Sequence, residues 1–205
     1  MRMPPLPNPL TPLTRDRIAA GAVGDRPIDV PVSAITITPY DSAWPAQYAA
    51  QRSQITGALG ARAFTVEHAG STAVPGLSAK NRLDIDLIVT DPADEAAYVP
   101  ALEAAGYALR LREPDWYEHR CLWNEGHTVN LHVFGPDCDE HLRHLILRDW
   151  LRSHPEDRAF YETEKQRSAT DNPWSMSAYN AQKAASIIEI LRRAGLRPAA
   201  ADQRM

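Results

Sequence analysis

The sequence predicts an α/β or α+β domain with one mixed β-sheet, flanked by helices and followed by a C-terminal helical block. Short apolar or alternating runs typical of strands recur as far as Phe134. Helical apolar stripes separate only some of these runs, so the chain lacks the regular strand–helix–strand order of a fully parallel sheet. From Leu142 onward the apolar residues follow helical spacing alone.

The 205 residues are enough for one domain. Residues 1–31 hold seven of the seventeen prolines and show little apolar periodicity, which predicts an extended or disordered tail. The domain itself is expected over residues 32–195, and residues 196–205 are expected to form a loose tail.

The first half of the domain is expected to contain three strands and one helix. Residues 35–38 alternate as a strand does, and residues 63–67 and 83–89 form apolar runs. Asp41 or Ser42 is placed to cap a helix between the first two of these strands. The apolar stripe of that helix consists of Trp44, Tyr48, Ile55 and Leu59.

In the second half, a helix is expected to begin at Asp91-Pro92 and to end at Gly106, and a strand over 107–111 follows it. Residues 116–123 and 128–134 are expected to form a hairpin. Three helices close the chain: the first is marked by apolar residues at 142–150, the second by a capping box at 153–156, and the third by apolar residues at 184–191.

Composition excludes several classes of function. The net charge of −4 offers no basic surface for extended nucleic acid, although a nucleotide needs only a local positive pocket. Cys121 and Cys138 form no Cys-x-x-Cys pair, so neither a disulfide framework nor a zinc site is expected. No apolar run reaches the roughly 18 residues of a membrane span, and the first residues lack the apolar core of a secretory signal. We therefore expect a cytoplasmic protein that does not bind membranes.

Two carboxylates stand in the strand predicted over residues 83–89. Successive side chains of a strand point to opposite faces, so Asp84 and Asp86 share one face and their apolar neighbours share the other. Two acids buried on one face are costly unless a charge compensates them, and a divalent cation is the usual compensation. The alternative is a solvated strand edge, where Asp-x-Asp is common.

A Gly-Ser turn precedes this strand. Gly70 lets the backbone approach a ligand closely, and Ser71 or Thr72 is placed to cap a short helix whose N–H groups attract phosphate. Twelve residues separate Ser71 from Asp84. A phosphate turn followed by paired carboxylates is typical of metal-assisted phosphoryl or nucleotidyl transfer.

Further candidates surround these two motifs. His68, directly before the turn, is placed either to accept a proton from a substrate or to hold the turn by a hydrogen bond. His132 faces the carboxylates if its strand neighbours theirs, and is otherwise a core histidine. The candidates for phosphate binding, whose alternative is a solvated surface, are Lys80, Arg82, Arg148 and Lys183.

Two weaker signals remain. Trp116 and Tyr117 are placed either to stack on a base or to cover the sheet. His141 and His144 stand at i and i+3 of an expected helix, a spacing that allows metal binding but is common by chance.

Several ordered segments resemble the GrpB family, within the nucleotidyltransferase superfamily. They are ITPYDSAW at 37–44, VEHAGSTAVPGLSAK at 66–80, NLHV at 130–133, LRDWLRSHPE at 147–156 and YNAQK at 179–183. The resemblance covers about residues 33–194 and is most specific at 66–80. It implies the nucleotidyltransferase fold, whereas the activity of the family is poorly characterised. One branch is fused to dephospho-coenzyme A kinase and has been described as a folding accessory.

The chain departs from the family pattern in one informative way. Family members often keep a single acid in the strand of Asp84, whereas this chain adds Asp86. Active superfamily members take a third carboxylate from the adjacent strand, where this chain and the family have a histidine, here His132. Histidine is a poorer Mg²⁺ ligand than a carboxylate but suits Mn²⁺. The resemblance therefore implies that Asp84, Asp86 and His132 hold Mg²⁺ or Mn²⁺. Because the third carboxylate is missing, it argues against the full two-metal mechanism of active superfamily members.

Two functions follow as hypotheses. In the first, an enzyme with Asp84, Asp86 and His68 in its catalytic site binds a nucleoside triphosphate and a divalent cation. It transfers the nucleotidyl group to an unknown small-molecule acceptor. In the second, a non-catalytic module of the same fold senses a nucleotide or assists a partner protein. Asp86 favours the first hypothesis, and the missing third carboxylate favours the second.

Overall fold

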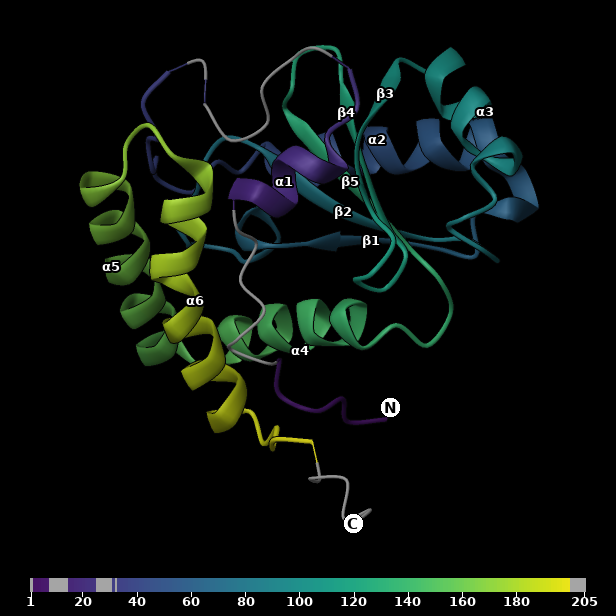
Figure 1. Cartoon of the computed structure of the whole chain (residues 1–205). Helices are drawn as coiled ribbons and strands as arrows, with labels where there is room; N and C mark the ends of the chain where they lie inside the picture. The colour runs from purple at the N-terminus through teal and green to yellow at the C-terminus, as the bar shows by residue number, and fades with distance from the viewer. Residues whose placement is uncertain (1, 8–14, 25–30, 32, 200–205) are drawn as a thin grey trace.

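The centre of the molecule is a five-stranded mixed sheet, seen in a computed structural model that describes residues 2–7, 15–24, 31 and 33–199 (Figure 1). The strands lie in the order β1-β2-β5-β4-β3. Their bounds are β1 Thr65–Ala69, β2 Leu83–Ile88, β3 Tyr107–Glu113, β4 His119–Asn124 and β5 Val129–Phe134. β2 and β5 run parallel, and every other neighbouring pair is antiparallel. The predicted mixed sheet and its hairpin are confirmed.

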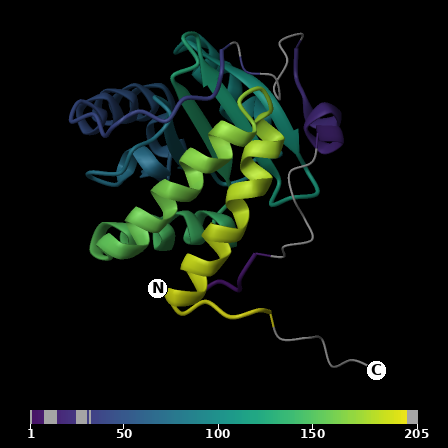
Figure 2. The same cartoon turned by 90° about the vertical axis from the view of Figure 1, so that its left-hand side faces the viewer.

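Helices cover both faces of this sheet. Their bounds are α1 Arg15–Gly21, α2 Trp44–Leu59, α3 Val99–Ala104, α4 Asp139–Ser153, α5 Pro155–Asp171 and α6 Met176–Arg193. In Figure 2 the sheet stands between α2 on one side and α1 on the other, with α5 and α6 in front. The predicted C-terminal helical block is confirmed as α4–α6. Within the described residues, no helix combines the length and the apolar character needed to cross a membrane.

The main hydrophobic core lies on the face of the sheet that α2 and α3 cover. Ile85 and Leu87 of β2 and Leu131 and Val133 of β5 are completely buried there. Each such side chain contributes roughly 1.5–3 kcal/mol when it leaves water. Because side chains alternate along a strand, the same register turns the two acids of β2 toward the opposite face.

Three expected details differ from the structure. Residues 35–38 form no strand, and Thr38 makes only an isolated bridge to Ala79, so the sheet has five strands instead of six. The helix expected from Asp91 begins only at Val99, after a single 3-10 turn.

The capping box at 153–156 is also absent. Ser153 is the last residue of α4, and its hydroxyl donates back to the carbonyls of Asp149 and Trp150, as serine does inside a helix. It is therefore not available to cap α5, which begins directly at Pro155.

The described N-terminal residues pack on the domain, which differs from the extended or disordered tail predicted over 1–31. Ile18 of α1 is 4% exposed, and Ala22 bridges to Leu111 of the edge strand β3. Leu6 is buried beside the end of α6, where its N–H donates to the carbonyl of Arg197 at 2.8 Å. A few apolar side chains dock this segment despite its many prolines.

The other parts of the predicted tails, residues 1, 8–14, 25–30, 32 and 200–205, lie outside the described residues. Leu196, at the start of the second tail, is 1% exposed. The division into a tail, a domain over 32–195 and a second tail stays a prediction.

Gly21→Ala is expected to displace α1 from the sheet, because the added methyl would lie 2.1 Å from the carbonyl oxygen of Arg112. We expect faster limited proteolysis near α1 and a free energy of unfolding lower by about 1–3 kcal/mol. Gly57→Ala in α2 is the matched control, since no atom lies within 4 Å of its added methyl. There alanine should stabilise the protein by roughly 0.5–1 kcal/mol. Equal effects in the two variants would contradict the packing of α1.

Candidate functional site

A cavity of about 770 Å³ lies on the polar face of the sheet, against α4, α5 and α6. This volume falls within the usual range for small-molecule sites. The cavity brings together most of the predicted site residues, which are Gly70, Ser71, Thr72, Lys80, Arg82, Asp84, His132, Arg148 and Lys183. Asp86 and His68, also predicted site residues, do not line it.

The Gly-Ser turn lies directly against Asp84, as its spacing predicts. β1 and β2 are antiparallel neighbours with Ala69 opposite Asp84, and Gly70 then opens the 3-10 turn Ser71–Ala73. Gly70 has a φ of +65°, and a Cβ there would lie 2.4 Å from the Oδ2 of Asp84. Only glycine allows this backbone conformation and this close approach together.

Asp84 is the carboxylate that faces the cavity. Asn130 donates a hydrogen bond of 2.8 Å to its Oδ1, and the Nε2 of His132 lies 3.6 Å away. Burial alone would raise the pKa of Asp84, but His132, Lys80 and Asn130 together hold it well below its usual range. Asp84 is therefore an anion at the centre of the cavity wall.

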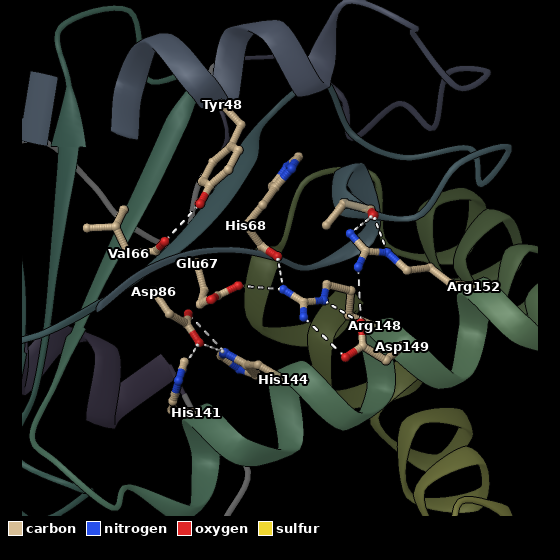
Figure 3. A network of polar contacts seen from close by, with 11 residues as sticks. Tyr48, Val66, Glu67, His68, Asp86, His141, His144, Arg148, Asp149 and Arg152 are labelled. Atoms are coloured by element: carbon tan, nitrogen blue, oxygen red, sulfur yellow. Dashed lines mark hydrogen bonds and ion pairs between the residues drawn. The ribbon is translucent and has the colours of Figure 1, made fainter. Parts of the chain in front are cut away.

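Asp86 instead attaches α4 to the sheet (Figure 3). Its carboxylate is completely buried, and the Nδ1 atoms of His141 and His144 lie 2.8 and 3.0 Å from its Oδ2. Burial opposes the charge of Asp86, yet the two histidines hold its pKa well below the usual range. Burial also opposes the charge of His144, but Asp86 raises the pKa of that imidazole to about 9. The result is an ion pair between the buried carboxylate of Asp86 in β2 and the half-buried imidazole of His144 in α4.

His68 lies on the other face of the sheet, because it alternates with Ala69 along β1. Its ring stacks on Tyr48 of α2 at 4.6 Å, and its Nε2 lies 3.0 Å from the Oγ1 of Thr72. Burial lowers the pKa of His68 to about 4. The geometry favours the turn-holding role over proton transfer to a ligand in the cavity.

Two arginines of α4 hold the two ends of the turn (Figure 3). Arg148 donates to the carbonyl of His68 at 3.0 Å and to Glu67 at 2.9 Å. Arg152 donates twice to the carbonyl of Ala73, at 3.0 and 2.8 Å. All three guanidinium nitrogens of Arg148 already have protein partners, two of them on Asp149. Arg148 is thus placed to position the turn, where the sequence predicts direct phosphate binding.

Arg82 is engaged in the same way. It lines the cavity, but its Nε donates to the carbonyl of His127 at 3.0 Å, in the turn between β4 and β5.

A cluster of lysines forms one end of the cavity. The Nζ atoms of Lys80 and Lys183 lie 5.0 and 5.1 Å from the ring centre of Tyr179, and Lys165 lies 5.0 Å from that of Tyr161. No ion pair within 4.0 Å joins these lysines to a carboxylate among the described residues. Burial first, and then the charge of Lys183, lower the pKa values of Lys80 and Lys165 to about 7. Burial opposes the charge of Lys183, but Tyr161 and Tyr179 raise its pKa. This end of the cavity therefore holds one charged lysine beside two that gain their full charge when an anion approaches.

A row of polar side chains continues from Asp84 across the sheet. The Nδ1 of His132 lies 3.0 Å from the Nε2 of His119, whose Nδ1 lies 2.9 Å from Glu113. Burial lowers the pKa of His119 to about 4. The row fixes the ring of His132 through its second nitrogen.

Of the three predicted metal ligands, Asp84 and His132 lie together, with the Nε2 of His132 3.6 Å from the Oδ1 of Asp84, whereas Asp86 is paired with α4. The Oδ2 of Asp86 contacts both His141 and His144, its Oδ1 lies 3.1 Å from the Nδ1 of His144, and neither oxygen lines the cavity. In the part of the chain that the structure describes, no group of three or more His, Cys, Asp or Glu side chains is arranged to hold a metal ion. The protein side chains that face the cavity thus offer part of a metal site, and the predicted Mg²⁺ or Mn²⁺ stays a prediction.

Several residues of the site escape prediction from the sequence. Lys165 is 1% exposed, and its ammonium donates to the carbonyl of Ser78. Its position in α5 shows only helical spacing, so nothing local marks it. His141 and His144 carry the spacing signal i, i+3, whose partner Asp86 lies 55 and 58 residues earlier in the chain.

Comparisons with known proteins agree with this architecture. The sequence profile described as "GrpB protein" matches residues 34–193. The UPF0157 protein BH1888 of Halalkalibacterium halodurans is 42% identical over 94% of this chain and 98% of its own length. A dephospho-CoA kinase of Mycolicibacterium paratuberculosis is 30% identical over 78% of this chain, and the match spans 46% of the kinase.

Among solved structures, the conserved protein GrpB from Enterococcus faecalis gives a TM-score of 0.70 at 30% identity, over 78% of this chain and 96% of that one. The poly(U) polymerase Cid1, in complex with its short product ApU, gives a TM-score of 0.41 at 14% identity. That match covers 64% of this chain and 40% of Cid1 and is a distant likeness in fold alone.

Gly70→Ala is expected to destabilise the protein by roughly 2–4 kcal/mol in urea unfolding, because the steric overlap with Asp84 adds to the backbone strain. Gly76→Ala is the control. Gly76 has a φ of +78°, but no atom lies within 4 Å of its added methyl, so this variant should lose only roughly 1–2 kcal/mol. The same loss in both variants would show that Asp84 does not press against the turn.

The Asp86–His144 pair predicts a loss of stability at alkaline pH. The pKa of His144 is raised to about 9 in the folded protein, above the ordinary value near 6.5 of the unfolded chain. Its contribution is therefore complete below about pH 6.5 and lost as the pH rises through about 9. Thermal midpoints should fall by several degrees over this window, since each kcal/mol shifts them by roughly 2–4 °C. His144→Gln should flatten the curve, and an unchanged slope would contradict the pair.

Proposed function

The chain belongs to the GrpB family, and on that premise we propose that it binds a nucleoside triphosphate, with the phosphates at the lysine end of the cavity. The observation that carries the proposal is the lysine cluster of Lys80, Lys165 and Lys183. These ammonium groups converge on one wall without a carboxylate partner among the described residues. A polyanion placed there relieves their mutual repulsion and the cost of their burial.

The Gly-Ser turn supports the same placement of the phosphates. Gly70 and Ser71 line the cavity on the side of Lys80, and the backbone of residues 70–73 turns tightly there. Such backbone turns direct N–H groups at anions. Arg148 and Arg152 hold this turn in place, so its shape does not depend on the ligand.

A second candidate function is transfer of the nucleotidyl group to a small-molecule acceptor. One observation favours it: the carboxylate of Asp84 lies against the turn, where a cation bound to the phosphates would meet it. A single open carboxylate beside the phosphates offers part of a metal site. A divalent cation, Mn²⁺ in particular, would then arrive with the nucleotide instead of binding beforehand.

Lys80→Ala and Lys183→Ala are each expected to weaken binding of ATP by roughly ten- to a hundredfold in isothermal titration, because each removes a charged donor to phosphate. Arg167→Ala is the control: this cation is on α5, and its side chain is 60% exposed and paired with Glu164. Its affinity should match the wild type. Unchanged affinity in both lysine variants, or no binding of any nucleoside triphosphate by the wild type, would refute the proposed site.

Asp84→Asn separates the two candidate functions by the sign of its effect. If the lysines alone bind the phosphates, the variant should bind ATP more tightly without metal, because a nearby negative charge is removed. If a cation joins Asp84 to the phosphates, the variant should lose the binding that Mg²⁺ or Mn²⁺ supports. Titrations with EDTA, Mg²⁺ and Mn²⁺ measure both. A variant identical to the wild type in all three would remove Asp84 from either role.

A further inference from the structure

We propose that the turn between β3 and β4 is the nucleobase-binding end of the same cavity, with the ring of Tyr117 as its stacking surface. This inference rests on the proposed function and deepens it, since it says which part of a nucleotide the protein recognises besides the phosphates. The argument starts from the backbone of the turn.

The turn has an unusual backbone for its sequence. The N–H of His119 donates to the carbonyl of Trp116 at 3.1 Å, and the two residues between them, Tyr117 and Glu118, have φ values of 56° and 51°. A hairpin turn with two positive φ values strongly prefers Asn-Gly, because side chains with a bulky Cβ substituent are strained there. The chain therefore gives up stability to keep a tyrosine at this place.

The strained turn presents the ring of Tyr117 at the cavity. Tyr117 lines the cavity and is 38% exposed, although it is a large aromatic side chain. Trp116 packs against its ring at 5.4 Å with an angle of 68°. Arg143, which is 4% exposed, donates to the hydroxyl of Tyr117 at 3.0 Å and pairs with Glu140 at 2.7 Å. Two neighbours thus fix the ring before any ligand arrives, which lowers the cost of binding.

The ring lies at the opposite end of the cavity from the phosphate-binding groups. Asn130 contacts Asp84 at the start of β5, and Phe134 at the end of β5 packs against Trp116 with ring centres 6.2 Å apart. These four steps along the strand span about 13 Å at roughly 3.3 Å per residue. One cavity therefore offers cations at one end and an aromatic ring at the other. A nucleotide has the matching parts, an anionic chain and a planar base.

The test compares two kinds of ligand that share the triphosphate chain: nucleotides, which carry a base, and inorganic tripolyphosphate, which carries none. ATP, GTP, CTP and UTP are each titrated against inorganic tripolyphosphate on the full chain. We expect at least one nucleotide to bind about tenfold more tightly than tripolyphosphate, since stacking on an aromatic ring is worth that much. Tyr117→Phe should keep this preference, because it keeps the ring.

Two glycine variants of the same turn separate recognition from strain. Both Tyr117→Gly and Glu118→Gly relieve a positive φ, and Glu118→Gly should raise the thermal midpoint by a few degrees. Tyr117→Gly also loses the contacts with Trp116 and Arg143, so it should gain less. Only Tyr117→Gly should remove the preference for the nucleotide, while its affinity for tripolyphosphate stays the same.

Two results would overturn the inference alone: equal affinity of the wild type for all five ligands, or a preference that survives in Tyr117→Gly. If neither kind of ligand binds the wild type, the proposed function fails as well.

Discussion

The buried carboxylate of Asp86 connects the sheet to the C-terminal helical block, and the shape of the cavity between them depends on this contact. A buried anion is costly unless hydrogen bonds and a counter-charge compensate it. His141 and His144 provide both from one face of α4. Once α4 is fixed in this way, Arg148 and Arg152 reach the two ends of the Gly-Ser turn. One ion pair thereby sets the position of the helical block, the turn and the cavity between them.

Rules that depend only on neighbouring residues predict the strands, the helices and the face to which each strand side chain points. The two-residue period of a strand places Asp84 and Asp86 on one face, and the register of β2 with β5 adds Asn130 and His132 to that face. Once the register of β1 with β2 sets Ala69 opposite Asp84, the same period places His68 on the opposite face. Strands, helices and the shared face of the acids are thus visible in the sequence.

What the sequence does not reveal depends on contacts between distant segments. Asp84 and Asp86 look equivalent in the sequence, and only the docking of α4 decides that one faces the cavity and the other an ion pair. The lysine cluster is assembled in the same way, because Lys80, Lys165 and Lys183 come from a loop, α5 and α6. Lys80 and Lys183 are candidates from their places near matched motifs, whereas Lys165 has no local pattern that differs from an ordinary surface lysine. The sequence does not predict α1 for a similar reason, since prolines surround the few apolar residues through which it packs on the domain.

The N-terminal segment has a consequence for how proteins of this family are compared. Pro7, Arg17 and Ile18 line the cavity, yet they precede the region 34–193 that matches the family profile. Part of the cavity wall therefore lies outside the region that matches the family profile. A relative that shares residues 34–193 but differs in this segment has the same turn and helical block beside a different wall, which changes the molecules that fit. A protein shortened to the family boundaries would keep its sheet and lose that wall, so its ligand preferences would describe a more open site than the one in the longer chain.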